Sequence, residues 1–304
     1  GTNMDKSQVG IEGTDFWGFG ASPQSDVMLG GAYHNGTLLK DNDTYINDWI
    51  CTGGGDGVRG FVNFGNDRIA YDDYEGRILS GDRTMNINGF QFDSLPNASY
   101  IFGESSTMEW DPRNNQHIYL GRGKNLLKTE DNGLTFELVY SFPSKVMNLE
   151  ISRANLDVMY LVTYESWWGD KKIWRTQDAG VSWNEITPPT ALLNGELWVP
   201  FDIAVSASNA NELWAVRTSQ YGNTNLNGRM VFKSMDGGAT WTNYTSASLD
   251  GEVITNIEHQ KGTAGGVYIG TRRAVYYRNN TMNEWALFNN NLPLSTTSTK
   301  LVIK

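Results

Sequence analysis

Acidic residues in predicted loops are the side chains of this chain best suited to catalysis. Asp72 and Asp73 are adjacent, whereas Asp56 and Glu165 lie in two other predicted loops. Glycoside hydrolysis needs one carboxylic acid to protonate the leaving oxygen and a second carboxylate to activate water or attack the sugar, and inverting enzymes hold the two about 6.5–9.5 Å apart. These four residues are therefore the candidate catalytic residues. The alternative interpretation is that they are ordinary solvated loop acids.

Aromatic residues in the same loops are candidates for ligand binding. Residues 164–170 read Tyr-Glu-Ser-Trp-Trp-Gly-Asp, and adjacent tryptophans break the in–out alternation of a strand. At least one ring should then face solvent or a ligand, where aromatic rings stack on sugars and concentrate binding energy. The alternative is that one ring caps the sheet while the other packs on its neighbour. The predicted aromatic contacts are Tyr164, Trp167, Trp168, Trp198 and Tyr221.

Arginine residues could add a second kind of contact. Several lie in predicted loops: Arg59, Arg122, Arg217, Arg272 and Arg273. A guanidinium group offers a planar fork of donors that suits a carboxylate. Arg122 and Arg217 therefore join the predicted ligand-binding set.

The sequence shows no motif typical of a metal site or of a catalytic nucleophile. The three histidines, His34, His117 and His259, are far apart and lack paired ligand spacing, which argues against a zinc site. Residues 41–48 carry oxygen ligands but lack the glycine and distal glutamate of a calcium-binding loop. Cys51 is the single cysteine, so no intramolecular disulfide can form. We predict no cofactor and no metal.

Three copies of one eight-residue pattern reveal how these loops are positioned. Residues 129–136, 176–183 and 234–241 each read Ser/Thr-x-Asp-x-Gly-x-Thr/Ser-aromatic, at intervals of 47 and 58 residues (129 to 176, 176 to 234). In a tight turn the Asp carboxylate can accept hydrogen bonds from backbone N–H groups, and the Gly can adopt a positive φ. Asp131, Asp178 and Asp236 are therefore predicted to be structural.

Short β-like runs recur around these turns and predict a repeat architecture. Runs beginning at Val27, Arg68, His117, Val158, Glu212 and Gly266 are 41 to 54 residues apart. Most follow a polar turn and precede a glycine-rich turn and a third strand, such as 172–175 or 230–233. Four antiparallel strands per unit of about 40–55 residues are typical of a β-propeller blade.

Six units are visible, three of them with degenerate turns at 40–45, 80–84 and 277–281. Segments 13–19 and 299–304 read as strands that could pair to close the ring. We predict an all-β fold: a single β-propeller domain over residues 1–304, with six or seven four-stranded antiparallel blades. A fragment of a longer secreted protein is the alternative domain description.

The strand order and the three turns resemble the Asp-box, or bacterial neuraminidase repeat, propellers. That superfamily includes sialidases, xyloglucanases, sortilin-type receptors and photosystem II assembly factors, and phrases such as 30–37 and 275–293 resemble secreted propellers of Bacteroidetes. The resemblance implies that the turns lie between the third and fourth strands, with the binding loops on the opposite face. One propeller scaffold supports many unrelated functions.

The resemblance to two enzyme families is incomplete. The chain lacks the Arg-Ile-Pro segment that sialidases carry near their start. Segment 53–60 is similar to the glycine-rich entry of xyloglucanase propellers, but those enzymes place two catalytic aspartates on two propellers around a cleft. Only one propeller is predicted here, and loop 71–76 does not align its Asp cleanly.

Net charge and the lengths of apolar runs limit the classes of partner that this chain could bind. The 304 residues carry a net charge of −10, which argues against nucleic acid or an anionic membrane as the main partner. No apolar run is long enough to span a membrane. From the sequence we expect a bacterial monomer, secreted or on the cell surface, that binds a glycan or a protein without catalysis. The alternative is a polysaccharide-degrading hydrolase or lyase.

Overall fold

The structure is a computed structural model. It describes residues 16–32, 35–41, 49–53, 60–67, 69–72, 75–78, 88–91, 107–165, 171–193, 200–217, 228–263, 265–288, 301 and 303.

These residues form six four-stranded antiparallel sheets, numbered here in chain order. Sheet 1 contains β1 (Phe16–Ala21), β2 (Met28–Ala32), β3 (Gly36–Lys40) and β4 (Trp49–Gly53). Sheet 2 contains β5 (Gly60–Val62), β6 (Ile69–Asp72), β7 (Glu75–Ile78) and β8 (Asn88–Gln91). Sheet 3 contains β9 (Met108–Trp110), β10 (Ile118–Arg122), β11 (Asn125–Thr129) and β12 (Glu137–Ser141).

The second half of the chain repeats this order. Sheet 4 contains β13 (Lys145–Ile151), β14 (Met159–Tyr164), β15 (Lys171–Thr176) and β16 (Asn184–Glu185). Sheet 5 contains β17 (Pro200–Val205), β18 (Leu213–Arg217), β19 (Val231–Ser234) and β20 (Thr242–Asn243). Sheet 6 contains β21 (Ile254–His259), β22 (Val267–Thr271), β23 (Val275–Arg278) and β24 (Ala286–Leu287).

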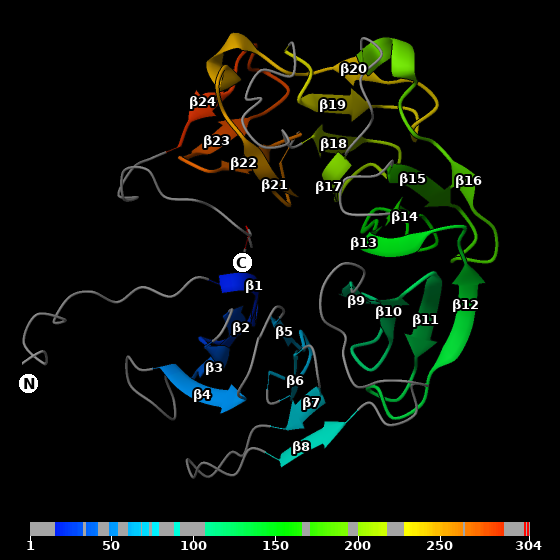
Figure 1. Cartoon of the computed structure of the whole chain (residues 1–304), viewed down its shortest axis with the longest axis vertical. Helices are drawn as coiled ribbons and strands as arrows, with labels where there is room; N and C mark the ends of the chain where they lie inside the picture. Colours follow the sequence, from blue (N-terminus) through cyan, green and yellow to red (C-terminus); the bar gives the residue numbers. More distant parts are fainter. Residues whose placement is uncertain are drawn as a thin grey trace, which may run out of the picture.

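The sheets are arranged around a centre, with the first strand of each innermost and the fourth outermost (Figure 1). This confirms the predicted all-β propeller with four-stranded blades. Among the described residues there is no strand of a seventh blade and no α-helix, only two 3-10 turns, Thr190–Leu193 and Ala247–Leu249. In the same residues, no helix has the length and apolarity needed to cross a membrane. The predicted pairing of 299–304 with the first strand lies outside the described residues, apart from 301 and 303.

Each of the three Asp-containing turns, called box turns below, begins at the last residue of a third strand and ends just before the fourth. In the middle turn, Asp178 accepts hydrogen bonds from the Thr176 hydroxyl and from both the backbone and the hydroxyl of Ser182. The same set recurs around Asp131 and Asp236. Gly133, Gly180 and Gly238 have φ of 93°, 95° and 91°. Hydrogen bonds from hydroxyl groups lower the pKa values of Asp178 and Asp236 to about 2, so these carboxylates are ionised braces.

A belt of polar contacts joins neighbouring sheets at the end where the box turns lie. Its four members are Asn63 Nδ2 to the Asn115 carbonyl (2.7 Å), Arg113 Nη1 to Asp157 Oδ1 (2.9 Å), Arg175 Nη2 to Asn211 Oδ1 (2.5 Å) and Lys233 Nζ to Asn280 Oδ1 (2.7 Å). They link sheet 2 to 3, 3 to 4, 4 to 5 and 5 to 6. All these turns therefore lie on one side of the molecule, which we call the box face.

A buried carboxylate joins the innermost strands of sheets 4, 5 and 6. In sheets 1, 4, 5 and 6 the first strand contains a register shift near its start. In sheet 5 Asp202 follows this shift and is 8% exposed. Its Oδ1 accepts hydrogen bonds from Asn148 Nδ2 (2.5 Å) and from the backbone N–H of Ile203 in the same strand (3.0 Å). Its Oδ2 accepts a hydrogen bond from the backbone N–H of Ile257 (3.1 Å). One carboxylate thus connects the first strands of sheets 4, 5 and 6.

Sheets 1 and 2 contact each other through buried side chains, among them Leu29 and Val62, and through close backbone contacts at two glycines. A Cβ atom at Gly60 would overlap the carbonyl of Leu29, and one at Gly20 would overlap the carbonyl of Gly60. The glycines are required at these two positions because strands β1, β2 and β5 approach too closely for any side chain.

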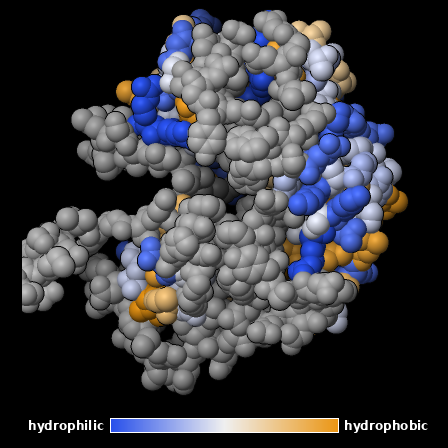
Figure 2. Space-filling model, in the orientation of Figure 1, coloured by the Kyte–Doolittle hydropathy of each residue, from blue (hydrophilic) through white to orange (hydrophobic). Residues whose placement is uncertain are grey.

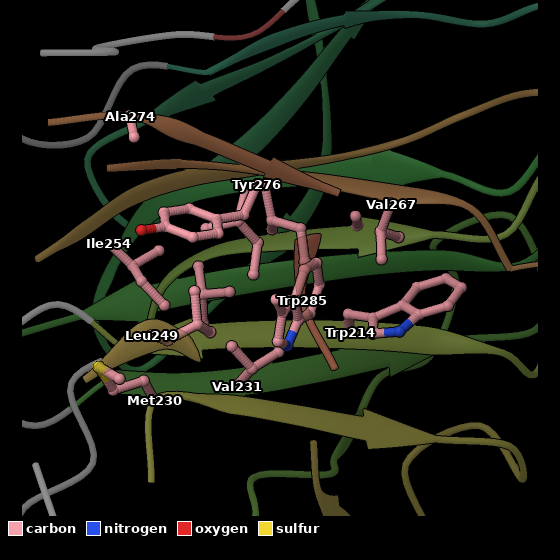
Figure 3. Close-up of a cluster of buried hydrophobic side chains, with 13 residues drawn as sticks. Trp214, Met230, Val231, Leu249, Ile254, Val267, Ala274, Tyr276 and Trp285 are labelled. Atoms are coloured by element: carbon pink, nitrogen blue, oxygen red, sulfur yellow. The ribbon is translucent and has the colours of Figure 1, made fainter. Parts of the chain in front are cut away.

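Side chains fill the boundary between sheets 5 and 6. A cluster of thirteen buried residues lies there, including Trp214, Leu249, Val267, Tyr276 and Trp285 (Figure 3). The surface in Figure 2 shows apolar areas that are small and separated by hydrophilic ones near the outer rim. The large exposed apolar side chains of the described residues lie mostly in box turns and fourth strands, as do Leu134, Leu138, Val181 and Met235.

A buried polar group lies at the box-face end of this boundary. Glu212 and Lys233 form an ion pair of 2.7 Å, and the Lys233 ammonium lies 4.8 Å from the centroid of the Trp214 ring. His259, 4% exposed, stacks on the same ring, with centroids 5.5 Å apart. Its Nδ1 accepts from the backbone N–H of Ala207 (3.4 Å), so the ring is a neutral acceptor at that atom.

We expect this histidine to make stability fall at mildly acidic pH. Burial lowers the pKa of His259; Lys233 and Lys261 act in the same direction, and the carboxylate of Glu212 opposes them. The unfolded chain then binds the proton more readily than the folded one. The free energy of unfolding should have its full value above the unfolded-state pKa of histidine, about 6.5. It should decrease as the pH falls below that value, by at most about 1.4 kcal/mol per pH unit.

Urea unfolding between pH 8 and pH 5 measures this effect. His259→Gln should flatten the decline, whereas His117→Gln, in a polar turn of sheet 3, should leave it in place. An equal decline in His259→Gln and the unmodified protein would contradict the assignment.

Candidate functional site

The predicted site residues that the structure describes lie mostly at the ends of second strands. Asp72, Arg122, Tyr164, Arg217 and Thr271 are the last residues of β6, β10, β14, β18 and β22. Because neighbouring strands are antiparallel, these ends lie opposite the box turns. We call this side the second-strand face. The fold and this face define an all-β propeller with acidic and basic residues at strand ends on one side.

The connections on this face differ in length. Sheets 3 and 6 have two-residue turns, 123–124 and 272–273, because Arg122 pairs with Asn125 and the Thr271 N–H donates to the carbonyl of Ala274. In sheets 4 and 5 the residues between the second and third strands are 165–170 and 218–230. Short turns hold their side chains in place, which suits a binding residue.

Two of the four candidate catalytic acids fall at least partly within the described residues. Asp72 is paired with Gly60 of β5, so its backbone is fixed within sheet 2; its side chain lies outside the described part. Glu165 follows β14 directly and is exposed. Asp56 and Asp73 lie outside the described residues. Both described acids therefore lie on the second-strand face.

The predicted role of Tyr164 as a stacking anchor needs correction. Its ring is fully buried, because Tyr164 continues the alternation of Tyr160 and Val162 onto the face of sheet 4 that packs against sheet 5. Lys145 and Lys171 pair with it from the two neighbouring strands, and the Lys145 ammonium lies 5.8 Å from the ring centroid. Burial lowers the pKa of Lys171 to about 8. The other predicted aromatic contacts, Trp167, Trp168, Trp198 and Tyr221, lie outside the described residues.

Of the two predicted arginines, Arg217 is buried and Arg122 is not fully buried. Arg217 is 3% exposed, and its Nη1 donates to the carbonyl of Arg229 (3.2 Å). It therefore braces the connection between β18 and β19, which corrects its predicted role. Arg122 is partly buried, and burial lowers the pKa of its guanidinium.

A buried carboxylate on this face escaped the sequence analysis. Glu252 precedes β21, is 6% exposed, and accepts hydrogen bonds at Oε1 from Arg273 Nη2 (3.0 Å) and the Tyr276 hydroxyl (3.2 Å). The only local signal was an acid after the turn 250–251, which is typical of a solvated residue. Its partners come 21 and 24 positions later in the chain.

Within the described ranges no group of three or more His, Cys, Asp or Glu side chains could hold a metal ion. Cys51 is exposed. Most of the oxygen-rich segment 41–48 lies outside those ranges.

Comparison with known proteins found similarity to a xyloglucanase and to GH74 enzymes. No protein-family model matches the chain. A xyloglucanase of Hypocrea jecorina (strain QM6a) is 27% identical over 221 residues, which cover 70% of this chain. Among solved structures, a GH74 enzyme of Niastella koreensis (TM-score 0.62, 17% identity, 90% of this chain), an ancestral GH74 enzyme (0.66, 16%, 91%) and a GH74 xyloglucanase of Xanthomonas campestris (0.61, 15%, 91%) are similar. At these identities the structures show a shared propeller fold.

The chain spans only part of each of these proteins. It covers 24% of the Hypocrea enzyme, and 46%, 38% and 45% of the three solved chains in the order given above.

Proposed function

We propose that this chain is a propeller lobe of a polysaccharide-degrading glycoside hydrolase of the xyloglucanase kind. The observation that carries the proposal is the 27% identity to a xyloglucanase over 221 residues, because that likeness is in sequence rather than in fold alone. The GH74 enzymes with similar structures agree with it. This proposal replaces the non-catalytic binding module expected from the sequence as the leading function.

The backbone position of Asp72 gives the proposal a chemical basis. Asp72 is held at the end of a paired strand, where a carboxylate can be positioned better than on a loop. We propose that it serves as the acid or base of the reaction, and that Asp56, Asp73 or Glu165 supplies the second carboxylate. A polymer substrate would also place the protein outside the cell.

We expect reducing ends to be released from xyloglucan, and Asp72→Asn to lower the rate about 10²- to 10⁴-fold, the usual contribution of a general acid or base. Asp26→Asn, at an exposed acid of the box face, is the matched control and should keep full activity. Binding to immobilised xyloglucan is measured on the same samples.

The outcomes separate the alternatives. Release that survives Asp72→Asn would exclude Asp72 and leave Asp56, Asp73 and Glu165. Binding without release would favour a lobe that recognises glycan but needs a second carboxylate. If the protein neither binds neutral plant polysaccharides nor releases reducing ends from them, the proposed function is overturned.

A further inference from the structure

The two-residue turn of sheet 6 holds an arginine in a fixed position on the second-strand face. The Thr271 hydroxyl accepts from the backbone N–H groups of Arg273 (3.1 Å) and Ala274 (2.9 Å), and it donates to the carbonyl of Ala274 (3.1 Å). Thr271 is fully buried. The backbone of Arg273 therefore cannot move without breaking this set.

The guanidinium of Arg273 is oriented from the segment that precedes β21. Its Nη2 donates to the carbonyl of Gly251 (2.8 Å) and to Glu252 Oε1 (3.0 Å). The side chain of Arg273 remains 57% exposed, against 8% for that of Glu252. Its Nε and Nη1 groups make no hydrogen bond with the described residues. The Nη2 group of the guanidinium is thus held, while the donors on Nε and Nη1 are available.

Glu252 is itself held from inside the core. The Tyr276 hydroxyl donates to its Oε1 (3.2 Å), and the backbone N–H of Glu252 donates to the carbonyl of Leu249 (3.0 Å). In Figure 3 that hydroxyl points to the end of the buried cluster where Ile254 lies, away from Trp214. Glu252 Oε2 is buried and has no hydrogen-bond partner among the described residues, so the carboxylate depends on Arg273 for its compensating charge.

We propose that Arg273 donates hydrogen bonds to the sugar oxygens of the bound polysaccharide, and that Glu252 is the positioning residue that holds it. The inference rests on the proposed function. A preorganised donor loses little conformational freedom on binding, so it contributes more affinity than a flexible surface side chain. A role limited to stability is less suited to this pair, because ion pairs with an exposed partner contribute little to stability.

Arg273→Lys tests the contact, because lysine can still compensate Glu252 but loses the planar set of donors. We expect KM for xyloglucan, or Kd where binding alone is measured, to rise at least about tenfold, equivalent to about 1.4 kcal/mol. The melting temperature should change by less than about 2 °C. Arg153→Lys, at an exposed arginine of the box face, is the matched control and should leave both values unchanged.

Glu252→Gln tests the positioning role. It should raise KM while kcat changes less, and the Arg273→Lys/Glu252→Gln double variant should be little worse than either single variant, since both disturb one interaction. Unchanged KM or Kd in Arg273→Lys would overturn the inference and leave the proposed function standing. Absence of xyloglucan binding and cleavage in the unmodified protein would overturn both.

Discussion

Asp202→Ala should lower the free energy of unfolding by about 3–5 kcal/mol, because it removes a buried charged group that accepts three hydrogen bonds. The Asn148 side-chain amide and the backbone N–H of Ile257 would lose their acceptor. Since these groups belong to sheets 4 and 6, the loss should weaken the connection of three sheets at once. Urea unfolding followed by tryptophan fluorescence measures the change.

The control for this variant is Asp250→Ala, at an exposed acid in the turn before β21. It should change the unfolding free energy by less than about 0.5 kcal/mol. A loss below about 1 kcal/mol in Asp202→Ala would mean that the contacts of Asp202 do not join the sheets.

Trp214→Ala should cost about 3–5 kcal/mol, the usual range for a buried tryptophan. Trp214 is fully buried between sheets 5 and 6, and its ring contacts both His259 and Lys233. Its removal leaves a cavity and takes the aromatic face away from a buried ammonium. Urea or thermal unfolding measures the loss.

Two comparisons show whether the cost comes from the cavity. Trp214→Phe should lose less than half as much, because a ring remains in place. Trp49→Ala, at a tryptophan that is 37% exposed, should lose less than Trp214→Ala. Equal losses in Trp214→Ala and Trp49→Ala would contradict the proposed importance of the boundary between sheets 5 and 6.

The repeat architecture could be predicted because its signals are local. A box turn contains its own hydrogen bonds within eight residues, and the predicted third strands 172–175 and 230–233 overlap β15 and β19. The first strand was predicted at 13–19, and β1 runs from Phe16 to Ala21. The contacts between sheets could not be predicted, because the partners of Asp202 lie 54 and 55 positions away.

The candidate site was harder to predict for the same reason. Whether a strand-end residue faces solvent or the neighbouring sheet depends on the alternation of its strand, which placed Tyr164 and Arg217 inside. Continuing the alternation of Tyr160 and Val162 would have indicated this for Tyr164. Glu252, in contrast, was not predicted as a site residue. Its burial depends on Arg273 and Tyr276, which are distant in the sequence, so the sequence showed only an acid beside a turn.

The glycine contact between sheets 1 and 2 has a consequence for how the protein can change over generations. A boundary filled by side chains can drift, because one side chain can shrink while its neighbour grows. Gly20 and Gly60 have no smaller alternative and no neighbour that could give way except backbone. We therefore expect random mutagenesis with selection for folded protein to accept paired substitutions between sheets 5 and 6, and to return glycine at these two positions.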